Sequence, residues 1–163
     1  MSINVQEAVK QSMQTEKNAM NFYQMGSQWM KDPEAKRIFE ILAKEEREHA
    51  GHFYKIYKGT DIPSLDAFLD TPPDNESSWI STIARIILED FNEQKAMEAA
   101  MDREKILEEA LKKLASLVDD VEIKAVFELN AKETHNHYLM IESEYARIMG
   151  MVHESDMDIY VRE

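Results

Sequence analysis

The sequence contains no cysteine, and only four glycines and four prolines in 163 residues. Without cysteine there are no disulfides, thiolate metal ligands, cysteine nucleophiles or Cys-x-x-Cys iron sites within it. Because glycine and proline are the commonest breaks between helices, their scarcity favours a few long helices. Long runs rich in Ala, Glu, Lys, Leu and Met, which are good helix formers, point the same way. The composition therefore predicts an all-α protein.

Basic residues are also few. There are 19 Lys and Arg against 32 Asp and Glu, which gives a formal net charge of −13. A field this negative disfavours nucleic acids and anionic membranes as partners. No stretch approaches the roughly 20 uninterrupted apolar residues of a membrane span, and the N-terminus has no apolar signal region. We therefore expect a cytoplasmic protein without nucleic-acid or membrane partners.

Capping signals and the helical spacing of apolar residues predict a first pair of long helices. The first helix starts near Ser2 or Asn4, either of which can cap it, and runs to about Met30. Asp32-Pro33-Glu34 starts the second, since Asp is a good N-cap, Pro fits the first helical position and Glu the first turn. So short a link makes the two helices antiparallel, and they form a hairpin over residues 4–58.

A long connection is predicted over residues 59–89. Its first part, 59–78, contains three of the four prolines. The following segment, 79–88, is strongly apolar and is expected to be helical, either as a separate helix or as the start of the next one. Its apolar residues Trp79, Ile80 and Ile83 are expected to cover an open bundle end or a partner subunit.

A second hairpin is predicted over residues 90–149. Its first helix covers roughly 92–118, and Asp119-Asp120 caps the next one. That last helix is expected to reach Met149 and to end before Gly150. The resulting division is a bundle domain over 1–150 and a C-terminal tail over 151–163.

Residues 13–53 and 101–141 form an internal repeat with a constant offset of 88 and no gap. The repeat predicts two similar hairpins that pair about a pseudo-twofold axis into a four-helix bundle. Glu16 is then expected to face Glu104, and His49 to face His137. The matched pairs are Met13 with Met101, Glu16 with Glu104, Lys17 with Lys105, Asp32 with Asp120, Phe39 with Phe127, Glu45 with Glu133 and His49 with His137.

Carboxylates and histidines lie on the apolar faces of these helices. Glu46 and His49 form a Glu-x-x-His motif whose two side chains share one face of the second helix, and Glu16 is in line with the apolar residues of the first. Buried charges are costly unless they are paired or metal-bound. A histidine hydrogen-bonded to a glutamate is the simpler interpretation of one such motif. The matching Glu104 and His137 favour a divalent metal, since carboxylate and imidazole suit iron, manganese or zinc.

The segments TEKNAMNFYQ (15–24) and FEILAKEEREHAGHF (39–53) resemble the diiron domain of rubrerythrins and their ferritin-like relatives. The resemblance covers about residues 5–149. It implies a ferritin-like four-helix bundle with a long crossover connection and a dinuclear non-haem iron site, with zinc or manganese as alternatives. By this resemblance the metal ligands are Glu16, Glu46, His49, Glu104 and His137.

The second half departs from the family pattern at two positions. Thr134 stands where the second Glu-x-x-His motif has its glutamate, and threonine does not replace a bridging carboxylate. The adjacent Glu133 either turns inward as a substitute or remains in solvent, as its equivalent Glu45 is expected to do. Leu107 occupies a position at which peroxide-reducing rubrerythrins tend to carry a further glutamate. One of the two metal positions is therefore weakened.

The resemblance implies oxidation of ferrous iron by O₂ or peroxide, an oxidoreductase activity of ferroxidase or peroxide-reductase type. The expected partners are metal ions, O₂ or peroxide, a separate electron donor and a second copy of the chain in a homodimer. A second hypothesis, favoured by Thr134, is a ferritin-like metal-binding or interaction protein without redox turnover. A storage cage is disfavoured because no fifth helix is evident after Gly150.

Overall fold

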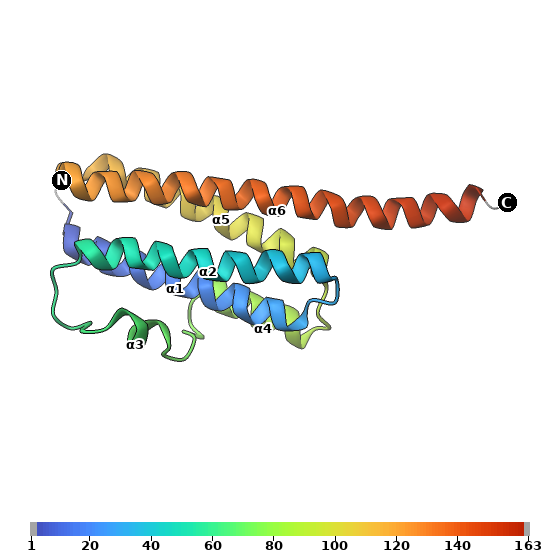
Figure 1. Ribbon diagram of the computed structural model, residues 1–163, viewed down its shortest axis with the longest axis horizontal. Helices are drawn as coiled ribbons and strands as arrows, with labels where there is room; N and C mark the ends of the chain where they lie inside the picture. Colours follow the sequence, from blue (N-terminus) through green and yellow to red (C-terminus); the bar gives the residue numbers. More distant parts are fainter. Residues whose placement is uncertain (1–2, 162–163) are drawn as a thin grey trace.

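The computed structural model describes the backbone of residues 3–161 and the side chains of residues 3–150. Over this part of the chain there are six helices and no strand. The four long helices α1, α2, α5 and α6 form an antiparallel bundle, while α3 and α4 lie in the connection between its two hairpins (Figure 1). The helices are α1 Val5–Trp29, α2 Pro33–Ile56, α3 Leu65–Leu69, α4 Ser78–Leu88, α5 Glu93–Leu117 and α6 Val121–Val161.

Capping side chains start the four long helices, and the caps of α1, α2 and α6 are among those predicted from the sequence. In each case a side-chain oxygen accepts a hydrogen bond from the backbone N–H three residues further on, which satisfies a donor that the helix leaves unpaired. Ser2, the alternative cap of the first helix, lies outside the described residues. The capping side chains are Asn4 for α1, Asp32 for α2, Asn92 for α5 and Asp120 for α6.

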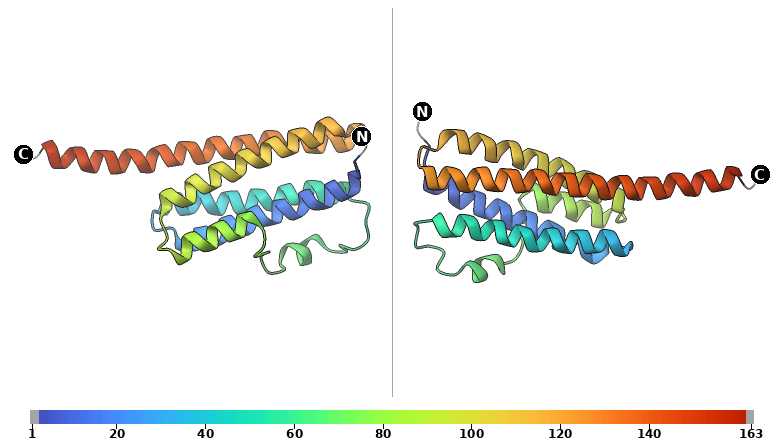
Figure 2. Two further views of the ribbon diagram at one scale, coloured as in Figure 1. Left: turned by 180° about the vertical axis from the view of Figure 1, so that it is seen from behind. Right: turned by 45° about the horizontal axis from the view of Figure 1, so that its top comes forward.

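The last helix is longer than the sequence suggests. The prediction that it ends at Met149 is wrong, because α6 continues through Gly150 to Val161. One glycine inside a helix costs only about 1 kcal/mol relative to alanine, and no proline follows to stop the helix. The final part of α6 extends past the end of the bundle (Figure 2). The backbone of the predicted tail is therefore helical as far as Val161.

In the connection between the hairpins, α4 packs along α1 and α3 contacts α2. Helix α4 contacts α1 and α5, and its Trp79, Ile80 and Ile83 are buried against the chain's own core. The indole of Trp79 meets the ring of Phe22 edge to face at 5.3 Å between centroids. Asp90, whose φ is 81°, separates α4 from α5. Helix α4 is thus a separate helix that covers one flank of the bundle.

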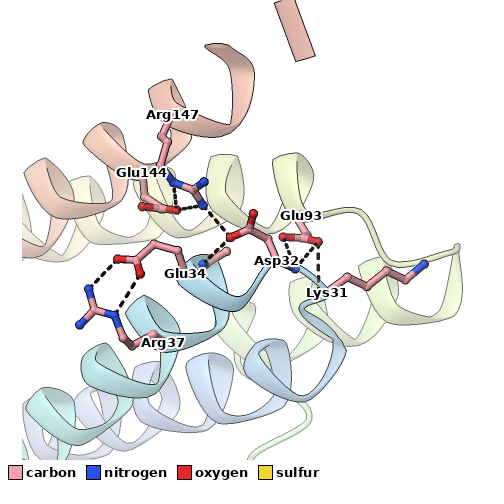
Figure 3. Close-up of polar contacts among 8 residues, drawn as sticks. Lys31, Asp32, Glu34, Arg37, Glu93, Glu144 and Arg147 are labelled. Carbon is pink, nitrogen blue, oxygen red and sulfur yellow. Dashed lines mark hydrogen bonds and ion pairs between the residues drawn. The ribbon is translucent and has the colours of Figure 1, made fainter. Parts of the chain in front are cut away.

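A polar network joins the two hairpins at the turn between α1 and α2 (Figure 3). The guanidinium of Arg147 on α6 donates to the Asp32 carboxylate at 2.6 Å and also contacts Glu144. The Glu93 carboxylate on α5 accepts hydrogen bonds from the backbone N–H groups of Lys31 and Asp32. The residue that caps α2 is therefore held by both helices of the other hairpin.

The interior between the hairpins is apolar at both ends and polar in the middle. Towards the α1–α2 turn the rings of Tyr23 and Phe39 meet edge to face at 5.0 Å. At the opposite end Phe53 of α2 contacts Phe127 of α6 at 5.2 Å. No described helix is both long and apolar enough to cross a membrane. The polar layer between the aromatic groups contains the residues of the candidate site.

Candidate metal centre

All five sequence-predicted ligands lie in the interior of the bundle. None of their side chains is more than 3% exposed. The five residues come from four different helices. The inward orientation follows from the repeat, because the same register places a glutamate and a histidine on equivalent faces of each hairpin. They are Glu16 on α1, Glu46 and His49 on α2, Glu104 on α5 and His137 on α6.

Glu46 lies between the two histidines. Its Oε1 is 2.7 Å from Nδ1 of His137, and its Oε2 is 3.7 Å from Nδ1 of His49. The two imidazole rings are stacked with centroids 4.9 Å apart. The structure thus confirms that His49 faces His137, and it places Glu46 where both histidines can share it.

Each histidine also faces a second carboxylate. Oε2 of Glu16 is 3.5 Å from Nδ1 of His49, and Oε1 of Glu104 is 3.6 Å from Nδ1 of His137. The two halves of the cluster therefore have the same plan, with one glutamate of their own and Glu46 in common. The tightest group is Glu46, His49 and His137, whose ligand atoms all lie within 4.8 Å of one another.

The outer nitrogens of both histidines face glutamates from the opposite hairpin. Nε2 of His49 is 2.5 Å from Oε2 of Glu133, and Nε2 of His137 is 3.6 Å from Oε2 of Glu45. A carboxylate that accepts the Nε2 proton fixes the tautomer and leaves the Nδ1 lone pair directed inward. Glu133 therefore does not substitute for the missing glutamate, and neither Glu133 nor Glu45 is simply a solvent residue.

Tyr23 adds a hydrogen bond to the α5 side of the cluster. Its hydroxyl donates to Oε1 of Glu104 at 2.6 Å. Burial, together with the Glu104 carboxylate, raises the pKa of Tyr23 well above its usual value, so the hydroxyl keeps its proton. This bond leaves Oε2 of Glu104 without a partner in the protein.

The second-half position equivalent to Glu46 is also buried. Thr134 is 0% exposed, and its Oγ1 has no hydrogen-bond partner. Leu107, one turn after Glu104 on α5, is 6% exposed. Neither residue supplies a carboxylate, so the second half of the site has one fewer carboxylate than the four-glutamate pattern of such bundles.

The residues present fit a bound cation. Among the described residues, every buried polar side-chain atom without a hydrogen-bond partner belongs to this cluster. These atoms include both carboxylate oxygens of Glu16 and of Glu46, and Nδ1 of both histidines. Buried polar atoms are costly when unpaired, and oxygen and imidazole donors of this kind are those that iron, manganese and zinc bind.

In the absence of a cation, protons balance part of the charge. Burial raises the pKa of Glu16 well above its usual value, with a further contribution from Glu46. Burial and the Glu46 charge raise the pKa of Glu104 to about 7. Burial alone lowers the pKa of His49, but Glu16 and Glu46 outweigh it and raise the value to about 11. A metal ion would therefore displace protons as it binds.

An antiparallel four-helix bundle with glutamates and histidines converging at its centre defines the class of ferritin-like carboxylate proteins. The family profile described as Rubrerythrin matches residues 7–145. The chain therefore belongs to the rubrerythrin family, as the sequence resemblance implies, and the family and this cluster together indicate iron binding. No curated protein and no solved structure matches the chain.

Proposed function

We propose that this protein holds a dinuclear non-haem iron site and oxidises ferrous iron with O₂ or peroxide as the oxidant. The observation that carries the proposal is the convergence, from four helices, of buried carboxylate oxygens and imidazole nitrogens that lack hydrogen-bond partners. A divalent cation satisfies such a group without a separate partner for each atom. Membership of the rubrerythrin family supports iron as the metal.

The side chains divide into those that hold metal and those that orient the holders. Glu46 is the candidate shared ligand because its two oxygens face different histidines. Glu16 serves the His49 side and Glu104 the His137 side. Bound iron supplies the electrons for reduction of the oxidant. The protein excludes bulk water from these groups by burying them, and Glu133 fixes the imidazole of His49 through its outer nitrogen.

The electron supply and the assembly remain predictions. These 163 residues contain no cysteine for an iron centre of the four-cysteine type, so the proposal takes the electrons from iron itself or from a donor centre outside these residues. The homodimer expected from the sequence is tested by light scattering coupled to size-exclusion chromatography. A mass corresponding to a single chain would contradict it.

Metal content after anaerobic loading with ferrous iron tests the proposal directly. We expect two irons per wild-type chain, and loss of iron in Glu46→Ala and in His49→Ala. Glu48→Ala on α2 and His135→Ala on α6 are the controls, since both side chains are exposed, and they should retain iron. Circular dichroism verifies that each variant remains helical. Equal iron content in the wild type and the two site variants would overturn the proposal.

A second candidate function is metal binding without redox turnover. Thr134 favours it, because this buried position supplies no carboxylate to the second half of the site. The two functions are separated by adding O₂ or peroxide to the iron-loaded protein and following the remaining ferrous iron with a colorimetric chelator. Oxidation faster than that of free ferrous iron supports the first function. Stoichiometric binding with no acceleration supports the second.

A further inference from the structure

Thr134 lies where the second Glu-x-x-His motif would have its glutamate, and it supplies no carboxylate. It lies three residues before His137 on α6, which is the position that Glu46 has relative to His49 on α2. The side chain is 0% exposed, and its Oγ1 has no hydrogen-bond partner. A buried hydroxyl without a partner is unfavourable, and a bound water, ion or small molecule is one way in which such a group is satisfied.

Two carboxylates of this half of the site, Glu133 and Glu104, already have partners elsewhere. Glu133 is held 2.5 Å from Nε2 of His49, on the opposite edge of the ring from Nδ1. Glu104 is already held by the Tyr23 hydroxyl. Relative to a pair of complete Glu-x-x-His motifs, the centre lacks one negative charge and two oxygen donors. Threonine also has a smaller side chain than glutamate.

We propose that a small carboxylate, of the size of formate or acetate, binds beside Thr134 and supplies the missing oxygen donors. The proposal rests on the proposed function, since the anion needs the metal ions as partners. Two divalent ions carry more positive charge than the three buried ligand carboxylates balance. An anion is therefore a better occupant than neutral water in a buried site. The Thr134 hydroxyl donates a hydrogen bond to the bound carboxylate.

The experiment is a titration of cobalt(II)-loaded protein with sodium acetate, followed by the visible absorbance of cobalt. Metal content is measured first, and sodium chloride at equal ionic strength is the control anion. Wild-type protein should show a saturable change that corresponds to one acetate per chain, while metal-free protein should bind none. A wild-type chain that takes up no cobalt overturns the proposed function and this proposal with it.

Two variants separate the proposed site from other acetate-binding positions. Thr134→Glu supplies its own carboxylate, so its spectrum without acetate should resemble that of the acetate-bound wild type and should not change further. Thr134→Val retains the shape and removes the hydroxyl, so its acetate affinity should fall about tenfold. A metal-loaded wild type that does not respond to acetate overturns the proposal alone. So does a Thr134→Glu variant that responds as the wild type does.

Discussion

Removing the charge of Glu133 should weaken metal binding even though this residue is not a candidate ligand. Its carboxylate lies 2.5 Å from Nε2 of His49, while Nδ1 of the same ring faces Glu16 and Glu46. Loss of such an outer partner typically reduces metal affinity about 10- to 100-fold, which corresponds to about 1.4–2.8 kcal/mol. Glu133→Gln retains an acceptor oxygen, so we expect a loss near the lower limit. Glu133→Ala should approach the upper one.

The internal repeat provides a comparison within the same protein. Glu45 has the equivalent position beside His137, but its oxygen is 3.6 Å from Nε2, beyond hydrogen-bond length. Glu45→Gln should therefore reduce the affinity less than Glu133→Gln. Glu128→Gln, an exposed position on α6, is the control. The assay is anaerobic competition for ferrous iron against a chelator of known affinity. An unchanged affinity in Glu133→Gln, or a larger loss in Glu45→Gln, would refute the reasoning.

Two further predictions concern the metal-free fold. A Cβ at Gly26 would lie 2.8 Å from the buried Phe39 ring, whereas one at Gly51 meets its nearest atom at 3.6 Å. Urea unfolding should therefore show Gly26→Ala destabilised by up to about 2 kcal/mol and Gly51→Ala stabilised by up to about 1 kcal/mol; shifts of the same sign would contradict this. The folded pKa of Glu104 is raised from 4.5 to about 7, so its protonation stabilises the fold fully below pH 4.5 and this contribution is lost as the pH rises towards 7. Between about pH 5 and about pH 7.5 the melting temperature of wild type should fall relative to that of Glu104→Gln, and an equal difference at both pH values would contradict this.

The starts of the helices and the residues that point into the bundle could be predicted from the sequence, because both depend on interactions within a helix. Asp32 before Pro33 and Asp120 before Val121 are capping signals that act within one turn. The positions of Glu16 and His137 follow from helical spacing and the repeat. The end of α6 could not be predicted from the sequence, because Gly150 weakens a helix without ending it.

Glu45 and Glu133 were missed for a different reason. Each is one residue away from the inward position of its helix, which is typical of a flanking residue in solvent. Their role depends on contact with a histidine of the other hairpin, and helix spacing alone contains no information about packing between hairpins. The repeat was the one feature of the sequence that could have pointed to this role, because Glu45 and Glu133 match each other at the same offset as His49 and His137. Trp79 likewise depends on packing, since only the fold shows that α4 covers α1.

The two hairpins belong to one chain, joined through α3 and α4. Each half of the centre therefore has its own positions in the sequence, and a substitution in one half leaves the other half unchanged. If two identical chains each contributed one hairpin, any substitution would alter both sides of the symmetric centre at once. In a single chain, Thr134 can differ from Glu46 while the first half keeps its complete motif. The fused arrangement therefore lets one side specialise, for instance in accepting an external molecule, while the other continues to anchor the metal.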